Sequence, residues 1–310
     1  MEADALAQLS NNLIYSAIAV YTLAMVGFAG QLAFGSQGRV ARSAALVGAG
    51  PEPAPPPAEA VDEGPAVGSR GDRLGRVAVS LTVLGFGLHL ASTIARGLAA
   101  GRAPFGNMYE FSAAGALAAV AVFLVLMTRR DVRYLGVFVL VPVVLSLGLA
   151  ITVLYTDAEQ LVPALQSYWL TIHVTAAIVS FGAFTVGAGL TVLYLLRRRA
   201  ERPGRLPSAE TLDRVAYRVH AFAFPLWTFA VMAGAIWAED AWGRYWGWDP
   251  KETWALVTWV VYAAYLHARA TAGWRGRGAA WIALAGYACF LFNYFGVNIW
   301  ITGLHSYAGV

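Results

Sequence analysis

The feature that most restricts the fold of this chain is a series of eight apolar runs, each about as long as a bilayer is thick. A helix needs roughly 20 mostly apolar residues to cross the hydrocarbon core, so each run predicts one transmembrane helix. The predicted fold class is an all-α integral membrane protein, a polytopic bundle of about eight transmembrane helices. The runs cover residues 10–34, 74–98, 108–128, 134–154, 168–196, 214–238, 253–270 and 279–302.

Composition excludes the main soluble classes. Hydrophobic residues make up 58% of the 310 residues and charged residues only 13%, whereas a soluble domain carries about 25% charged residues. The chain has a single cysteine, Cys289, inside an apolar run. It therefore has neither an intrachain disulfide nor a CxxC motif, and it is not itself a dithiol reductase or a c-type haem acceptor.

The chain divides into three predicted parts. Residues 1–35 form an N-terminal transmembrane helix, because their apolar run is too long for the core of a cleaved signal peptide. Residues 36–73 are rich in Pro and Ala and predict a disordered cytoplasmic linker, since such a composition does not form a packed core. Residues 74–310 form the main membrane domain, which contains the Trp-rich segment 242–254.

The basic residues predict the orientation of the bundle. Cytoplasmic loops of membrane proteins carry an excess of Lys and Arg, and alternate loops of this chain differ consistently in that way. Both termini and the loops 99–107, 155–167 and 239–252 are then predicted on the outer face, and the membrane is predicted to be a bacterial plasma membrane. The same distribution argues against nucleic-acid binding. Only four of the 22 basic residues fall on the predicted outer side, namely Arg96, Arg102, Arg244 and Lys251.

The segment 242–254 reads Trp-Gly-Arg-Tyr-Trp-Gly-Trp-Asp-Pro-Lys-Glu-Thr-Trp. Indole and phenol rings this dense predict a flat aromatic shelf that covers a planar apolar ligand. Arg244 and Lys251 can meet carboxylates of such a ligand. Asp249, followed by Pro250 and then Glu252, is typical of the first turn of a helix. The shelf residues are Trp242, Tyr245, Trp246 and Trp248.

Five histidines are candidate ligands because ionisable groups inside a membrane are costly and usually functional. His173 and His305 are predicted at the depth of the Trp-rich segment and on the same face. Two imidazoles beside an aromatic shelf suit a bis-histidine haem site; the alternative is a pair of interfacial polar residues without a ligand. His267 is predicted near the inner membrane surface, at the depth of His220, and its alternative is an interfacial residue beside Arg269. His89 is predicted deeper, close to the polar stretch 96–110.

The Trp-rich segment resembles the tryptophan-rich "WWD" signature of haem-handling proteins of cytochrome c biogenesis. The chain is most similar to the CcsA/ResC type of System II, called CcsB in some actinobacteria, from about residue 74 to 310. The resemblance includes Gly-Arg-x-Pro-Phe-x-Asn-Met-Tyr-Glu from residue 101, Tyr-Leu-His-x-Arg from residue 265, and the ending Phe-Gly-Val-Asn…Gly-Leu-His-Ser-Tyr.

The resemblance implies the site residues. His173 and His305 match the outer histidines that ligate the iron of haem b beside the WWD segment, and His267 matches a histidine of a second, inner haem site. The resemblance does not say whether the other inner ligand is His89, His220 or a residue of a partner. The implied partners are a ResB-type membrane protein, apocytochromes c and a thiol-reducing protein of the same pathway.

The predicted function is therefore haem transport or presentation on the outer face, for thioether attachment to the CxxCH motif of apocytochrome c. The chain would be a subunit of a cytochrome c synthase; no nucleophile or general base of its own is identified, so an enzyme label stays open. One alternative is a System I relative with the same signature. A second alternative is a membrane transporter, and a third is an anchor subunit, each with an aromatic collar and no haem.

Overall fold

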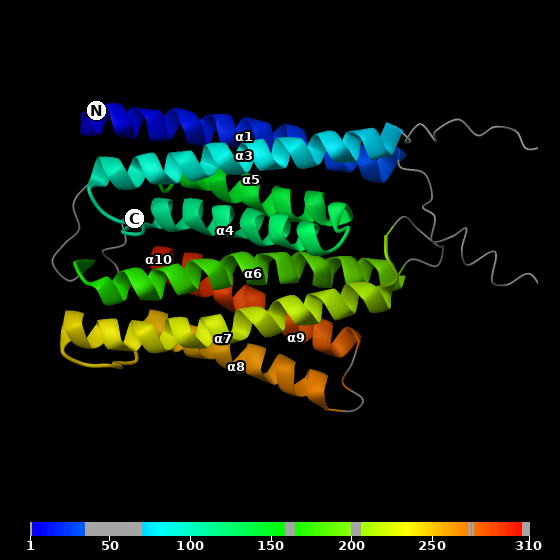
Figure 1. The fold of residues 1–310 in the computed structure, drawn as a ribbon. Helices are drawn as coiled ribbons and strands as arrows, with labels where there is room; N and C mark the ends of the chain where they lie inside the picture. Colours follow the sequence, from blue (N-terminus) through cyan, green and yellow to red (C-terminus); the bar gives the residue numbers. More distant parts are fainter. Residues whose placement is uncertain are drawn as a thin grey trace, which may run out of the picture.

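A computed structural model describes residues 2–34, 70–158, 165–199, 206–271, 274 and 276–305. The predicted linker falls outside these ranges, apart from residues 70–73, which begin a helix. The described residues contain no strand, and the long helices run along roughly one direction (Figure 1). These helices are α1 (Ala3–Phe34), α3 (Arg70–Ala100), α4 (Met108–Arg129), α5 (Gly136–Thr152), α6 (Tyr168–Arg199), α7 (Ala209–Trp242), α8 (Pro250–Ala270) and α9 (Arg277–Leu291).

Short elements complete the chain. The 3-10 turn η1 (Arg133–Leu135) leads into α5. A π-helical turn, η3 (Phe292–Gly296), follows α9 directly and continues into α10 (Val297–Trp300). Such a turn inserts an extra residue into the helical repeat and redirects the side chains around it, and it is frequent at functional sites.

Among the described residues, seven helical segments are long and apolar enough to cross a membrane. They correspond to seven of the eight predicted runs, and they confirm a polytopic helical bundle. The run 253–270 forms α8 as predicted but is not among the seven. Its charged first turn, with Lys251 and Glu252, and its polar last turn, with His267 and Arg269, explain the lower hydropathy.

Helix α6 forms the centre of the bundle. In its most apolar stretch 83% of the residues are buried, against 28–39% in the other six candidate spans. Small residues let its neighbours approach closely, as in other membrane bundles. A methyl group on Gly182 would lie only 2.5 Å from the backbone of Ala118 in α4.

Helix α1 joins the same core instead of forming a separate anchor. It lies beside α3 (Figure 1), and the hydroxyl groups of Ser10 and Ser92 each donate to the other residue's carbonyl oxygen. Farther along, the ring of Tyr21 occupies the space left by Gly85 of α3. Helix α1 therefore contributes side chains to the same hydrophobic core as the helices that follow it.

One end of the bundle carries the connection between α7 and α8, which holds the Trp-rich segment. The start of α1 lies at this same end (Figure 1), and so does His305, whose ring contacts Trp242. The loop between α3 and α4, residues 101–107, lies there as well, because it follows the end of α3, where Ser92 contacts Ser10 near the start of α1. We call this end of the bundle the aromatic end.

Candidate functional site

A cavity opens at the aromatic end between α4, α6, α7, α8 and the segment from η3 to residue 305. It holds about 1170 Å³ of unfilled space, counting the part open to solvent. Five of the predicted site residues line it: His173, His305, Trp242, Tyr245 and Trp246. The remaining walls are mostly apolar and aromatic, as in sites for planar organic ligands. They include Phe105, Met108, Phe111, Trp227, Trp237, Phe290 and Tyr294.

His173 is held on the α6 side of the cavity. Its Nδ1 lies 2.7 Å from the carbonyl oxygen of Ala230 in α7. A carbonyl oxygen only accepts hydrogen bonds, so Nδ1 carries the proton and Nε2 carries the lone pair. Gly234 makes this position possible, because a methyl group there would lie 2.7 Å from the imidazole ring.

His305 faces the same cavity from the segment after α10. Its Nδ1 donates to a carboxylate oxygen of Asp249 at 2.8 Å, so its Nε2 also carries the lone pair. Burial lowers the pKa of His305 below the ordinary value, although the hydrogen bond to Asp249 opposes that shift. The two imidazoles are thus both set in the tautomer that offers Nε2 to a metal.

Asp249 fixes His305 and the start of α8 together. It is the N-cap of α8, and it accepts the backbone N–H of Lys251 at 3.2 Å and that of Leu304 at 2.7 Å. Partial burial raises the pKa of the Asp249 carboxyl, but the hydrogen bonds from His305 and the two backbone groups outweigh burial and bring the pKa down to about 2. A carboxylate behind a ligating histidine fixes the orientation of the ring.

Trp237 of α7 connects the two imidazoles. Its ring is parallel to that of His173, with centroids 6.2 Å apart, and its centroid lies 5.7 Å from that of His305. Trp242 also contacts His305, with ring centroids 4.9 Å apart, and its ring lies 4.8 Å from that of Trp237. Sequence reasoning did not single out Trp237, because a tryptophan near the end of an apolar run is usual in any membrane helix.

Trp248 lies outside the cavity. Its side chain is 68% exposed, and its φ of 59° is the only positive value among the described residues other than glycine. Glu252 holds this turn by accepting the backbone N–H groups of Gly247 at 2.8 Å and Asp249 at 3.0 Å, on either side of Trp248. The predicted helix-start role of Asp249 and Glu252 is therefore observed as a complete capping box.

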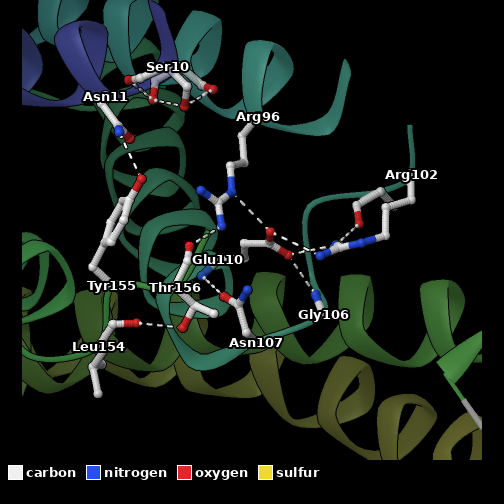
Figure 2. Close-up of polar contacts among 12 residues, drawn as sticks. Ser10, Asn11, Arg96, Arg102, Gly106, Asn107, Glu110, Leu154, Tyr155 and Thr156 are labelled. Carbon is white, nitrogen blue, oxygen red and sulfur yellow. Dashed lines mark hydrogen bonds and ion pairs between the residues drawn. The ribbon is translucent and has the colours of Figure 1, made fainter. Parts of the chain in front are cut away.

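The loop 101–107 forms another wall of the cavity, and a buried ion cluster holds it in place. Glu110, at the start of α4, pairs with Arg96 at 3.1 Å and with Arg102 at 2.8 Å, and it accepts the backbone N–H of Gly106 at 2.8 Å (Figure 2). Asn107 caps α4 by accepting from the backbone of Glu110. This polar stretch thus has a structural role in presenting Phe105 and Met108 to the cavity.

The other three histidines lie away from the cavity. His89 is fully buried between α3 and α1, with Nδ1 3.5 Å from the hydroxyl oxygen of Tyr21. His220 is fully buried in α7 beside Thr191 of α6. His267 is exposed on α8, whereas the α8 side chains that contact His220 are those of Tyr262 and Tyr265. The structure therefore does not bring these three histidines together.

The fold and the cavity define a class of protein: a polytopic helical membrane protein with an aromatic cavity at one end, faced by two histidines in the same tautomer. The model of the cytochrome C assembly protein family matches residues 105–305, which include both histidines and the Trp-rich segment. The chain belongs to this family.

Curated relatives and a solved structure agree with that assignment. Cytochrome c biogenesis protein CcsA of Synechococcus elongatus is 37% identical over 267 residues, covering 69% of this chain and 81% of the relative. CcsA of Chlamydomonas reinhardtii is 46% identical over 154 residues, covering 49% of this chain and 44% of the relative. The structure of cytochrome c heme lyase CcmF matches 95% of this chain with a TM-score of 0.63. At 18% identity, and with this chain spanning 47% of its length, that likeness concerns the fold.

Proposed function

We propose that this protein acts in cytochrome c biogenesis by binding haem b in the cavity at the aromatic end and presenting it for covalent attachment to apocytochrome c. The observation that supports this proposal most directly is that His173 and His305 line one aromatic cavity, and that the Nδ1 of each donates a hydrogen bond to an oxygen acceptor. The family and its CcsA relatives support a haem-handling role in this pathway. They do not favour the alternatives of a transporter or an anchor without haem.

The residues of the cavity fit a porphyrin. Two neutral imidazoles supply the nitrogen ligands that haem iron accepts on opposite sides. Trp242, Tyr245 and Trp246 supply ring faces for the apolar macrocycle. In our proposal the side chains orient haem and limit the access of water, and the apocytochrome brings its two thiols to the vinyl groups. Thioether formation then depends on proximity, with the iron chemistry supplied by haem.

The proposed orientation places the aromatic end on the extracytoplasmic side of a bacterial plasma membrane. Eighteen of the 22 basic residues, all but Arg96, Arg102, Arg244 and Lys251, fall in the loops and helix ends predicted to face the cytoplasm, and this asymmetry supports the orientation. The protein would work in a System II pathway with a ResB-type partner and a thiol-reducing protein.

An inner haem site that uses His267 remains part of the proposal. Because His267 is exposed on α8 and the described part of the chain offers it no facing histidine, its second ligand would come from the partner. His89 is separated from this position by its burial against α1, and we leave it out of the proposed site.

The test is the absorption spectrum of the purified protein together with cytochrome c maturation in cells. We expect His173→Ala and His305→Ala each to lose the low-spin haem spectrum of the cavity and to abolish maturation. The matched control is His220→Gln, which changes a buried histidine outside the cavity and should retain both. Normal maturation in the His173→Ala, His305→Ala double variant would refute the ligand assignment.

A further inference from the structure

The cavity contains one basic side chain whose position the proposed ligands do not explain. Lys251, in the first turn of α8, lines the cavity together with the two histidines. Its Nζ donates to the side-chain oxygen of Asn298 at 2.6 Å and lies 6.0 Å from the centroid of the Tyr294 ring. Among the described residues, no carboxylate lies within ion-pair distance of this ammonium group.

Neither of the two carboxylates nearest in sequence forms an ion pair with Lys251, although Glu252 also lines the cavity and its Oε1 is buried without a hydrogen-bond partner. Asp249 accepts from His305, Leu304 and the backbone of Lys251 itself. One oxygen of Glu252 accepts the two backbone N–H groups around Trp248. An ammonium group in an apolar wall is costly without an anion. The wall around Lys251 therefore suits an anion that arrives with the ligand.

The ammonium group is also held in a fixed direction. The amide nitrogen of Asn298 donates to the backbone carbonyl of Tyr294 at 2.7 Å, and this bond turns the amide oxygen of Asn298 toward Lys251. Tyr294 is fixed in turn, because its hydroxyl group donates to the carbonyl oxygen of Met108 at 2.7 Å. The π-helical turn and α10 thus position Lys251 through Tyr294 and Asn298, which line the same cavity.

Arg244 is the other basic residue of the Trp-rich segment, and the structure places it differently. Its guanidinium group packs against the Cα of Gly247, in the space that a larger residue would fill. Arg244 is exposed and does not line the cavity. From the sequence, either residue could bind a carboxylate of the ligand. In the structure only Lys251 lines the cavity.

We propose that Lys251 recognises a carboxylate of the ligand, and that in the cavity it pairs with one propionate of the porphyrin. This inference rests on the proposed function. The propionates and the vinyl groups of haem b are carried by different pyrrole rings. A propionate held at Lys251 therefore directs the vinyl groups away from the first turn of α8, and it restricts the rotation of the macrocycle in the cavity.

The test compares the binding of haem b with that of its dimethyl ester, in which both propionates are methylated, to the purified full-length protein. We expect the wild-type protein to bind haem b roughly tenfold or more tightly than the ester, because a charge-assisted hydrogen bond is worth about one to two factors of ten. Lys251→Met should abolish this preference while binding the ester as the wild-type protein does. Lys251→Arg should restore part of the preference, and Arg244→Met should leave it unchanged.

The outcomes separate this inference from the proposed function. An unchanged preference in Lys251→Met, or its loss in Arg244→Met, would overturn the role of Lys251. Equal binding of both porphyrins by the wild-type protein, with the bis-histidine spectrum intact, would overturn this inference alone. If the wild-type protein binds neither porphyrin, the proposed function fails as well. Retention of the low-spin spectrum in Lys251→Met is the check that the cavity has folded.

Discussion

The hydrogen bonds of Asp249 lead to a sharp prediction for Asp249→Asn. The carboxylate accepts three hydrogen bonds, one at Oδ1 from Leu304 and two at Oδ2 from Lys251 and His305. Asparagine has the same shape and is a good N-cap, so α8 should still begin at residue 249. Its amide has only one oxygen, however, and either orientation directs the NH₂ group at a backbone N–H that cannot change its role.

The expected loss of haem affinity depends on which side of the asparagine amide faces His305. If the NH₂ group faces Nδ1, the imidazole must move its proton to Nε2 and loses the lone pair that would bind iron. If the oxygen faces Nδ1, the N–H of Leu304 is left opposite a donor and the segment that carries His305 loosens. Loss of such an orienting group costs about 10–100-fold in metal affinity. We therefore expect haem to bind about 10–100-fold more weakly, or about 1.4–2.7 kcal/mol.

The assay is a haem titration of the purified protein, followed by absorption. Asp240→Asn is the matched control, because Asp240 lies at the same end of the bundle, is exposed, and accepts only from Ser167 among the contacts described for it. We expect the control to bind haem as the wild-type protein does. An Asp249→Asn variant with wild-type affinity and an unchanged low-spin spectrum would refute the orienting role of Asp249.

Three further predictions follow from the same contacts. Glu110→Gln should lower the free energy of unfolding by about 3–5 kcal/mol, because Arg96 and Arg102 lose a buried carboxylate; an unchanged thermal midpoint in detergent would contradict this. Trp248→Gly should raise stability by about 1 kcal/mol, because glycine adopts positive φ without strain, and a lower midpoint would count against it. The folded pKa of Asp249 is about 2, against an ordinary 3.8, so its stabilising hydrogen bonds persist above about pH 4 and are lost as pH falls through 2. Acid unfolding of the haem-free protein in detergent should therefore include a step in this range that Asp249→Asn lacks, and identical unfolding curves for the two proteins would refute it.

The sequence by itself determined the helices and the end of the bundle where the site lies. The length and apolarity of the runs predicted seven of the described spans, because transfer into the bilayer depends on local composition. Asp249, Pro250 and Glu252 predicted the start of α8, since helix capping is also a local interaction. The position of His173 near the start of run 168–196 and that of His305 just past run 279–302 predicted that they lie at the same end.

The tertiary structure decided which side chains face the cavity. It placed Trp237 in contact with both histidines, turned Trp248 outward, and directed Lys251 inward while Arg244 packs on its own loop. It also buried His89 against α1, a contact between residues 68 positions apart. In a soluble helix the apolar stripe marks the buried face, but in a bilayer the lipid and the protein interior are both apolar. The sequence therefore marks the depth of a residue in the membrane, and only the packing of neighbouring helices fixes the direction of its side chain.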